Sequence, residues 1–328
     1  MSMLLEQTAS KDITKDIGNN PVLMVLKLFA LSPNEHTFTT RFANGDGYVY
    51  LRIEGNEKLG PATQHDKSFL AFVLTRMLEM KEQGKDFRTL RVSISEYLRK
   101  MGINSSGHAY HQVNETIDRL TSTKVYTNVE LQGDGVVSYF NWIQSAKVHY
   151  TTRMIAGESK RCMTSFTIVP CEWIVNAAER GSFVEYAKGY FQLKSQLMQR
   201  IYEVVSTETQ KDIFKIRMQE LMERTGCDTS TKTFKKNLKR QIVGESGKPP
   251  TNVPEHAIYP YTEAHPEMSC AWGARVLAEK QWFVFVRGQP QTNELNIHLD
   301  EIPEWQPSLN SEDLNSLGVW VAEEEEDL

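Results

Sequence analysis

The spacing of hydrophobic and polar residues along the chain predicts an α+β protein in which helices alternate with short strands. Apolar side chains recur three and four positions apart over residues 69–83, as they do on the buried side of a helix. Other segments alternate between apolar and polar residues, which is typical of strands that bury one face. The first group of predicted elements begins with a helix at residues 69–83, a strand at 90–94 and a helix at 95–101. A further helix, buried through Val113, Ile117 and Leu120, and a hairpin of strands 124–131 and 136–142 follow.

The same order of elements is predicted a second time. After a strand at residues 165–169, it comprises a helix, a strand, two helices and a last strand: residues 192–206, 213–216, 218–225, 229–243 and 282–286. Helix, strand, helix, helix and hairpin is the order of a winged helix. We therefore predict two tandem winged-helix domains at residues 21–155 and 160–290. A disordered N-terminal segment (residues 1–20) is expected before them and an acidic tail (residues 300–328) after them.

The last predicted helix, over residues 229–243, carries an ordered set of positive charges. Its helical spacing places five basic side chains on one face: Lys232, Lys235, Lys236, Lys239 and Arg240. The opposite face is apolar and is formed by Phe234, Leu238 and Ile242. Gly226 ends the preceding helix, so a short helix, a tight turn and a basic helix follow one another, as in proteins that hold a helix in the DNA major groove. A lysine-rich face turned to solvent is the alternative interpretation.

The distribution of charge along the chain is more informative than its total. The chain contains 37 Lys and Arg against 42 Asp and Glu, a formal net charge of −5. Ten of the acidic residues lie from Asp300 onward, where there is no Lys or Arg. Residues 1–299 therefore hold 37 basic residues against 32 acidic ones (42 minus 10), so the body is mildly basic and the tail strongly acidic.

Several classes of protein are disfavoured by composition. The four cysteines form no CxxC pair, so the sequence predicts neither a zinc site nor a disulfide framework, and no cofactor. The apolar run at residues 21–31 is interrupted by Lys27 and is shorter than the ~20 residues that a membrane span requires. No secretory signal precedes this run. We expect a protein of the cytoplasm that does not enter a membrane.

Four short blocks of the sequence resemble the RepA-type plasmid replication initiators. They are residues 60–66 (GPATQHD), 119–128 (RLTSTKVYTN), 190–193 (YFQL) and 200–203 (RIYE), and the spacing of Gly226, Phe234 and Leu238 adds to them. The resemblance covers about residues 60–242 and is specific through the combination of blocks.

The resemblance implies a bacterial, plasmid-associated protein with tandem winged helices. It implies binding to repeated double-stranded sites (iterons) at a plasmid origin, help in opening that origin, and recruitment of the host replicative helicase and initiator proteins. It also implies repression of the protein's own gene by a dimer. In this family the first module often serves dimerisation, so a homodimer through that domain is expected.

Five residues of the first module are expected to lie nearest the DNA because they surround the start of its second short helix. They are Ser105, Ser106, His108, His111 and Gln112. Side chains at such a position reach base edges, and backbone N–H groups there face phosphate. Serines that only cap the helix and histidines in solvent would explain the same residues equally well.

Three functions are considered, in this order: plasmid replication initiator, winged-helix transcriptional regulator and rolling-circle nickase. A regulator would bind DNA without opening an origin. A nickase is disfavoured because His108 and His111 lack the spacing and the acidic partner of the paired histidines in such enzymes. Neither glycine-rich turn, at residues 44–47 or 133–135, begins a helix with a following Lys-Ser/Thr, so no ATP-binding loop is predicted. We expect a DNA-binding protein that is not an enzyme.

Overall fold

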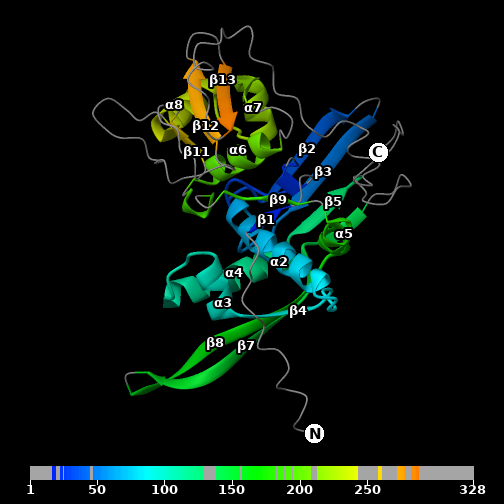
Figure 1. Ribbon diagram of the computed structural model, residues 1–328, viewed down its shortest axis with the longest axis vertical. Helices are drawn as coiled ribbons and strands as arrows, with labels where there is room; N and C mark the ends of the chain where they lie inside the picture. Colours follow the sequence, from blue (N-terminus) through cyan, green and yellow to red (C-terminus); the bar gives the residue numbers. More distant parts are fainter. Residues whose placement is uncertain are drawn as a thin grey trace.

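Helix α2 (Gln64–Glu82) lies at the centre of the fold, and elements from distant parts of the sequence pack against it (Figure 1). It contacts β1, α4, α5 and α6, and most of its side chains are buried, polar ones included. Since it is covered on several sides, α2 is a core helix rather than the one-sided helix that the apolar spacing predicts. This computed structural model describes residues 17–19, 23–24, 26–44, 47–128, 138–155, 157–181, 183–187, 190–193, 195–207, 213–242, 258–260, 272–277 and 282–287.

The first group of elements begins as predicted. Helix α2 is followed by β4 (Leu90–Ser93), α3 (Ile94–Lys100) and α4 (Gly107–Ser122). Ser93 caps α3 and Ser106 caps α4, each by accepting a hydrogen bond from the backbone N–H three residues later. The apolar positions predicted to be buried in α4 are buried: Val113, Ile117 and Leu120.

The hairpin that completes this group is not the predicted one. Strand β4 pairs with β8 (Glu158–Pro170), which pairs with β7 (Ile143–Ile155), giving the strand order β4-β8-β7. The predicted boundary between residues 155 and 160 therefore falls inside one hairpin, and residues 165–169 belong to the first group. The far half of the hairpin projects from the body (Figure 1). Most of its residues are exposed on both faces, so the one-sided alternation of a half-buried strand is lost there.

The strands predicted as the first wing pair with each other, but in another sheet. β5 (Lys124–Thr127) and β6 (Ser138–Asn141) extend the hairpin of β2 (Thr37–Asn44) and β3 (Gly47–Glu54), in the order β2-β3-β5-β6. The alternation of apolar and polar residues in a strand shows which of its faces is buried. It does not show which strand will pair with it, because pairing depends on tertiary packing.

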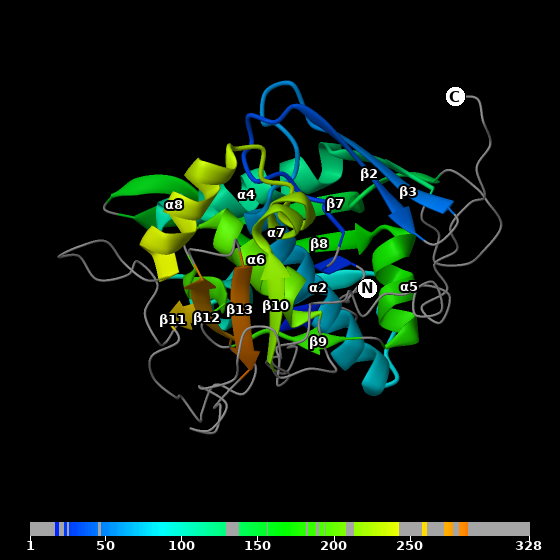
Figure 2. The same ribbon diagram turned by 90° about the horizontal axis from the view of Figure 1, so that it is seen from above.

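The second group contains the predicted helices in a separate layer (Figure 2). Strand order in its sheet is β10-β13-β12-β11, with β11 parallel to β12 and the other pairs antiparallel. Its elements are η1 (Tyr190–Gln192), α6 (Gln196–Ser206), β10 (Ile213–Arg217), α7 (Met218–Thr225), α8 (Thr231–Ile242), β11 (Ile258–Pro260), β12 (Trp272–Leu277) and β13 (Trp282–Arg287).

The N-terminal segment enters the fold earlier than predicted. β1 (Gly18–Asn19) pairs with β9 (Val184–Glu185), and the Asn19 side-chain amide donates a hydrogen bond to the Tyr186 hydroxyl at 3.1 Å. The prediction of disorder through residue 20 is therefore wrong for residues 17–19, because a polar composition does not reveal a partner so far along the chain. Residues 1–16 and the predicted acidic tail lie outside the described residues.

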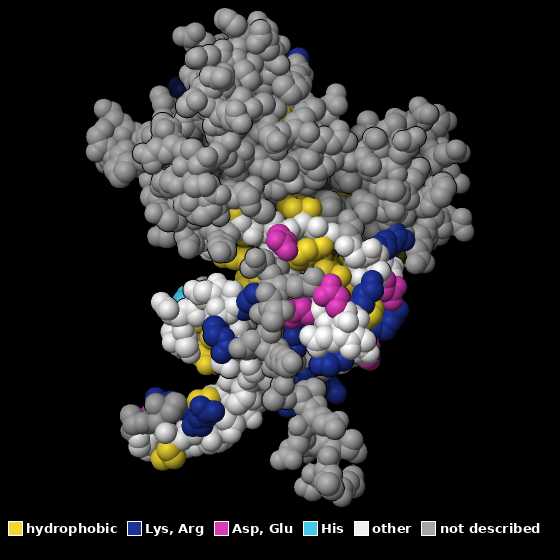
Figure 3. Space-filling view, viewed as in Figure 1, with side chains coloured by type: hydrophobic (Ala, Val, Ile, Leu, Met, Phe, Trp, Pro, Cys, Tyr) yellow, Lys and Arg dark blue, Asp and Glu magenta, His cyan; other side chains and the backbone are white. Residues whose placement is uncertain are grey.

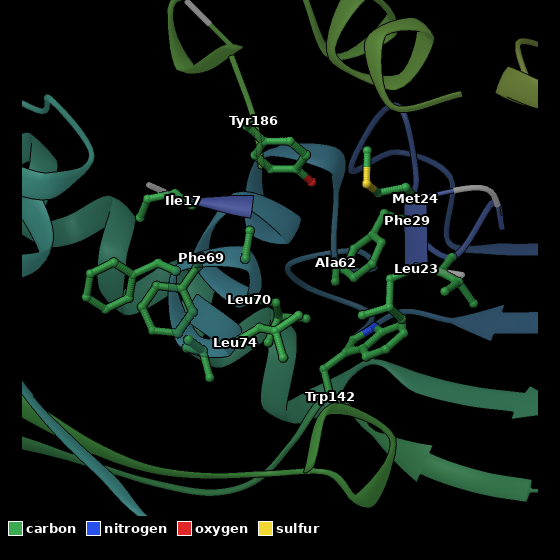
Figure 4. Close-up of a cluster of buried hydrophobic side chains, with 14 of the residues drawn as sticks. Ile17, Leu23, Met24, Phe29, Ala62, Phe69, Leu70, Leu74, Trp142 and Tyr186 are labelled. Carbon is green, nitrogen blue, oxygen red and sulfur yellow. The ribbon is translucent and has the colours of Figure 1, made fainter. Parts of the chain in front are cut away.

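One hydrophobic core joins the central helix to its neighbours (Figure 4). Phe69, Leu70 and Leu74 of α2 are buried in it, and the Phe29 ring stacks on Trp142 with centroids 4.8 Å apart. Helix α5 (Glu172–Arg180) contributes Trp173, whose ring lies 5.2 Å from that of Phe140. The Phe29–Trp142 contact connects segments that are more than a hundred residues apart.

A buried carboxylate, that of Glu203 on α6, joins the second group to α2. Its oxygens accept hydrogen bonds from Gln64 and Lys67 at 2.6 Å, from the Tyr186 hydroxyl at 2.6 Å and from the Tyr190 hydroxyl at 3.1 Å. Glu203 is fully buried and Lys67 is 1% exposed. Burial lowers the pKa of Lys67 to about 8, although Glu203 opposes the shift. Burial, reinforced by the charge of Glu203, raises the pKa of both tyrosines.

The residue beside Lys67 makes the matching connection to the first group. Asp66 is fully buried and accepts two hydrogen bonds from the Arg119 guanidinium of α4, both at 2.8 Å. It also accepts one from Thr116 at 2.7 Å and one from the backbone N–H of Thr63 at 2.8 Å, which closes the first turn of α2. Two adjacent residues of α2 thus hold α4 and α6.

Replacing Glu203 with Ala is expected to lower the free energy of unfolding by roughly 3–5 kcal/mol, since it leaves the Lys67 ammonium buried without its counter-charge. The double variant Lys67→Met/Glu203→Leu should recover only the part of that loss that comes from the unpaired ammonium, because Gln64, Tyr186 and Tyr190 still lack their acceptor. Urea unfolding followed by circular dichroism measures both. Glu179→Ala, which removes an exposed partner of Arg88, is the control and should change stability by less than about 0.5 kcal/mol. A comparably small effect of Glu203→Ala would contradict the assignment.

Candidate nucleic-acid interface

The start of α4 is a cluster of exposed polar side chains. All five residues predicted to contact DNA in the first module (Ser105, Ser106, His108, His111 and Gln112) are exposed. The Ser106 hydroxyl accepts a hydrogen bond from the backbone N–H of Ala109 at 3.1 Å, so it is the helix cap. His111 lies 3.5 Å from Glu115 one turn later. The structure brings these side chains to one end of one helix and leaves them accessible.

The β7–β8 hairpin supplies positive charge beside this helix end. Arg153 and Lys160 are directly opposite each other in the antiparallel register, and both are exposed. Like charges in that position destabilise a hairpin, and here Glu158, which lies 3.2 Å from the Lys160 ammonium, offsets part of the repulsion. Arg161 lies over the Tyr150 ring at 4.0 Å, and Figure 3 shows basic side chains along the projecting hairpin. The hairpin therefore offers a row of cations that sequence reasoning missed, because it assigned these residues to a boundary between domains.

A groove of about 850 Å³ separates the helix end from the hairpin. Ser105, Ser106 and His111 line one side of it, whereas Arg153, Lys160 and Arg161 line the other. The Tyr150 hydroxyl donates a hydrogen bond to Asn114 of α4 at 3.3 Å and links the two sides. His108 and Gln112 are not part of this groove, and Gln112 lines a cavity on the opposite side of α4. Three of the five predicted residues are thus combined with cations from another element.

Helix α8 presents the predicted basic face. Phe234 and Leu238 are fully buried, and Lys232, Lys236 and Arg240 are exposed. Lys235 is partly buried, and the side chain of Lys239 lies outside the described part of the structure. The apolar spacing therefore predicts the buried side of this helix correctly, and the exposed side carries at least three cations.

The turn before α8 is held by the N-terminal segment. The Lys27 ammonium donates a hydrogen bond to the Gly226 carbonyl at 3.0 Å and lies 4.6 Å from the Phe38 ring centroid. Burial lowers the pKa of Lys27. Arg200 of α6 is also basic, but it lies 3.7 Å from Glu203 and donates to the backbone carbonyls of Met24 and Arg224. It is 1% exposed and so lies away from any DNA surface.

Comparison with known proteins identifies the family of this chain. Residues 19–251 match the family described as Replication initiator protein A. The chain belongs to this family. A curated protein of Wigglesworthia glossinidia brevipalpis named "Putative replication protein" is 27% identical over 211 residues, which cover 63% of this chain and 74% of that protein.

One solved structure shows the same fold at low sequence identity. A crystal structure of domains 2 and 3 of RctB has a TM-score of 0.53 and 11% identity, over 80% of this chain and all of that one. A second structure of RctB domains 2–3 has a TM-score of 0.46 at 11% identity, over 79% and 93% of the two chains. Membership of this family supports a role in initiating replication. Among the described residues, no helix is long and apolar enough to cross a membrane.

Replacing Gly226 with Ala is expected to loosen the turn between α7 and α8. The residue has φ of 67°, and a Cβ there would lie 2.1 Å from Lys27 Cδ. The variant therefore combines left-handed strain of about 1–2 kcal/mol with loss of the Lys27 hydrogen bond. Gly102→Ala is the matched control, because Gly102 has φ of 66° and open space around it. Urea unfolding should show a larger loss for Gly226→Ala than for Gly102→Ala, and the difference should vanish in a Lys27→Ala background. If Gly226→Ala and Gly102→Ala cause equal losses of stability in the protein that retains Lys27, the proposed clash is refuted.

Proposed function

We propose that this chain is a plasmid replication initiator that binds repeated double-stranded sites at its origin through two winged-helix modules. The observation that carries the proposal is the pairing, within a replication initiator family, of two helix–turn–helix segments that each expose a polar or basic helix. Binding energy from many phosphate contacts can then be used to bend and destabilise an A·T-rich tract, which costs several kcal/mol.

In the first module, α4 is the recognition helix and β7–β8 is the wing. Ser105 and His111 at the helix end reach toward base edges, while Arg153 and Lys160 on the wing neutralise phosphate. Phosphate contacts give affinity and register, and contacts to base edges give sequence preference. The groove between helix and wing thus combines both kinds of contact on one surface.

In the second module, α8 is the recognition helix and β12–β13 is the wing. Lys232, Lys235, Lys236, Lys239 and Arg240 contact phosphates along one face of the helix. Two modules on one chain raise each other's effective concentration, so that two weak half-sites become one tight site. As a homodimer through the first module, the protein represses its own gene; at the origin it recruits the host replicative helicase and initiator proteins in the bacterial cytoplasm.

A winged-helix transcriptional regulator is the second candidate function. The exposed helices and the wing would serve it equally well, since duplex binding is common to both. The family match favours the initiator. The two functions differ in whether DNA is opened after it is bound.

Alanine at two cations in each module should reduce the salt dependence of binding to repeated duplex sites. Arg153→Ala/Lys160→Ala and Lys235→Ala/Lys236→Ala are each expected to lower the slope of log K against log salt by up to about 1.8, or ~0.9 per lost phosphate contact. Fluorescence anisotropy over a salt series measures the slope. If both modules bind the same duplex, the variant with all four changes should show the sum of the two reductions in slope.

Lys85→Ala is the control for these variants, because Lys85 is exposed just beyond the end of α2, away from both helices. Its slope should equal that of the unchanged protein. If either double variant also keeps the original slope, the corresponding module does not contact phosphate.

The purified protein is expected neither to cut DNA nor to hydrolyse ATP. On supercoiled plasmid carrying the origin, permanganate should detect reactive thymines in the A·T-rich tract without strand breaks. A covalent protein–DNA adduct would instead favour the nickase, and binding without reactive thymines, with host proteins present, would favour the regulator.

A further inference from the structure

The four-stranded sheet carries an aromatic and cationic row on its exposed face. Thr39, Arg52, Tyr126 and Tyr139 are consecutive partners in the register across β2, β3, β5 and β6. Their neighbours along the strands face the other way, and Leu51, Ile53 and Val125 are fully buried. The row therefore lies on the side of the sheet turned away from the core.

The side chains of the row are held in place by one another. The Tyr126 and Tyr139 rings lie edge to face with centroids 5.1 Å apart, and the Arg52 guanidinium lies 5.4 Å from the Tyr126 ring. Glu54 accepts a hydrogen bond from the Tyr126 hydroxyl at 2.8 Å and pairs with Arg52. This hydrogen bond lowers the pKa of Glu54 and raises that of Tyr126. Glu54 thus fixes both the ring and the guanidinium.

Cross-strand stabilisation accounts for only part of this arrangement. Pairs of aromatic and charged residues across strands stabilise a sheet, and the Arg52–Tyr126 contact is of that kind. Tyr139, however, is 70% exposed at the edge strand β6, so most of a large ring remains in contact with water. An exposed ring beside an ordered ring and a guanidinium is a surface on which another planar group can stack.

We propose that this row, defined by Arg52, Tyr126 and Tyr139, binds the unpaired bases of single-stranded DNA. Aromatic side chains on a sheet stack with bases whatever their identity, provided that the bases are not already stacked in a duplex. Among the charges described around the row, Arg52 and Lys124 are positive and Glu54 is negative. The excess of one positive charge favours the phosphate backbone of the DNA strand. The inference rests on the proposed function, since opening of the origin supplies the unpaired strand.

The position of the row allows duplex and single strand to be held together. The sheet lies on the other side of the molecule's central helix from the projecting β7–β8 hairpin (Figure 1). Strand β5 begins at Lys124, just beyond the C-terminal end of α4, whereas the candidate duplex contacts are at the N-terminal end of that helix. A bound duplex at the groove would therefore leave the row accessible to a separated strand.

The test uses the full chain and fluorescein-labelled oligo(dT) of about 15 nucleotides. Tyr139→Ala should weaken oligo(dT) binding roughly 5- to 150-fold, the range expected for one lost base–aromatic stack. Tyr139→Trp should retain or strengthen it, because the ring is preserved. Thr37→Ala, exposed at the far strand of the same sheet, should bind oligo(dT) like the unchanged protein. Thermal unfolding of each variant establishes that the fold is intact.

Two outcomes overturn the inference. Oligo(dT) binding that is unchanged in a folded Tyr139→Ala variant would mean that the row does not stack bases. A complete lack of oligo(dT) binding by the unchanged protein would leave the row as a sheet-stabilising pair or a contact for another protein. Binding to duplex repeats, measured in parallel, should be the same in all the variants, and its failure in the unchanged protein would refute the proposed function instead.

Discussion

Two adjacent buried ion pairs at the start of α2 determine how the two halves of this protein are arranged. Asp66 holds Arg119 of α4, and Lys67 holds Glu203 of α6. Because successive residues of a helix point in different directions, one turn of α2 fixes two other helices on different sides. A buried charge without its partner is costly, so each pair tolerates little displacement of the helices that bear it. The relative orientation of α4 and the second module depends on this one turn.

This constraint explains where the family resemblance lies in the sequence. Blocks 60–66, 119–128, 190–193 and 200–203 meet in three dimensions at the two carboxylates, through residues such as Asp66, Arg119, Tyr190 and Glu203. They lie outside the surfaces proposed to contact duplex DNA, although block 119–128 also includes Tyr126 of the row proposed to bind a single strand. The blocks that carry the resemblance therefore coincide with the junction between these helices.

The sequence predicts most of the helices and fails where long-range pairing decides the structure. Helices α7 and α8 follow from apolar spacing and from Gly226, because periodicity and a glycine cap are local properties. The β7–β8 hairpin was missed, and with it Arg153 and Lys160 of the candidate interface. An exposed hairpin has no buried face to impose a pattern on its sequence. Similarly, no local signal places the predicted β5–β6 pair in the sheet of β2 and β3 rather than beside β4.

The polar residues taken as candidate contacts show the same limit. Sequence alone could not separate Ser106 as a helix cap from Ser106 as a DNA ligand, and in the structure it is the cap at the edge of the groove. Arg200 is basic and close to a helix–turn–helix in sequence, yet it is buried and joined to backbone carbonyls 24 and 176 residues away. Whether a basic side chain is buried in the structure or exposed for binding cannot be read from the composition.

The attachment of the N-terminal segment to the second module affects the order in which the chain can fold. Met24 and Lys27 find their partners in Arg200 and Gly226, 176 and 199 residues later. At a synthesis rate of about 5–20 residues per second, the early segment waits roughly 10–40 s for these partners to be made. Until then, the elements of the first group can form, but the segment that contains Met24 and Lys27 lacks its contacts with the second module. The segment around residues 24–27, which is synthesised early, thus reaches its final packing only when α6 and the turn after α7 have been synthesised.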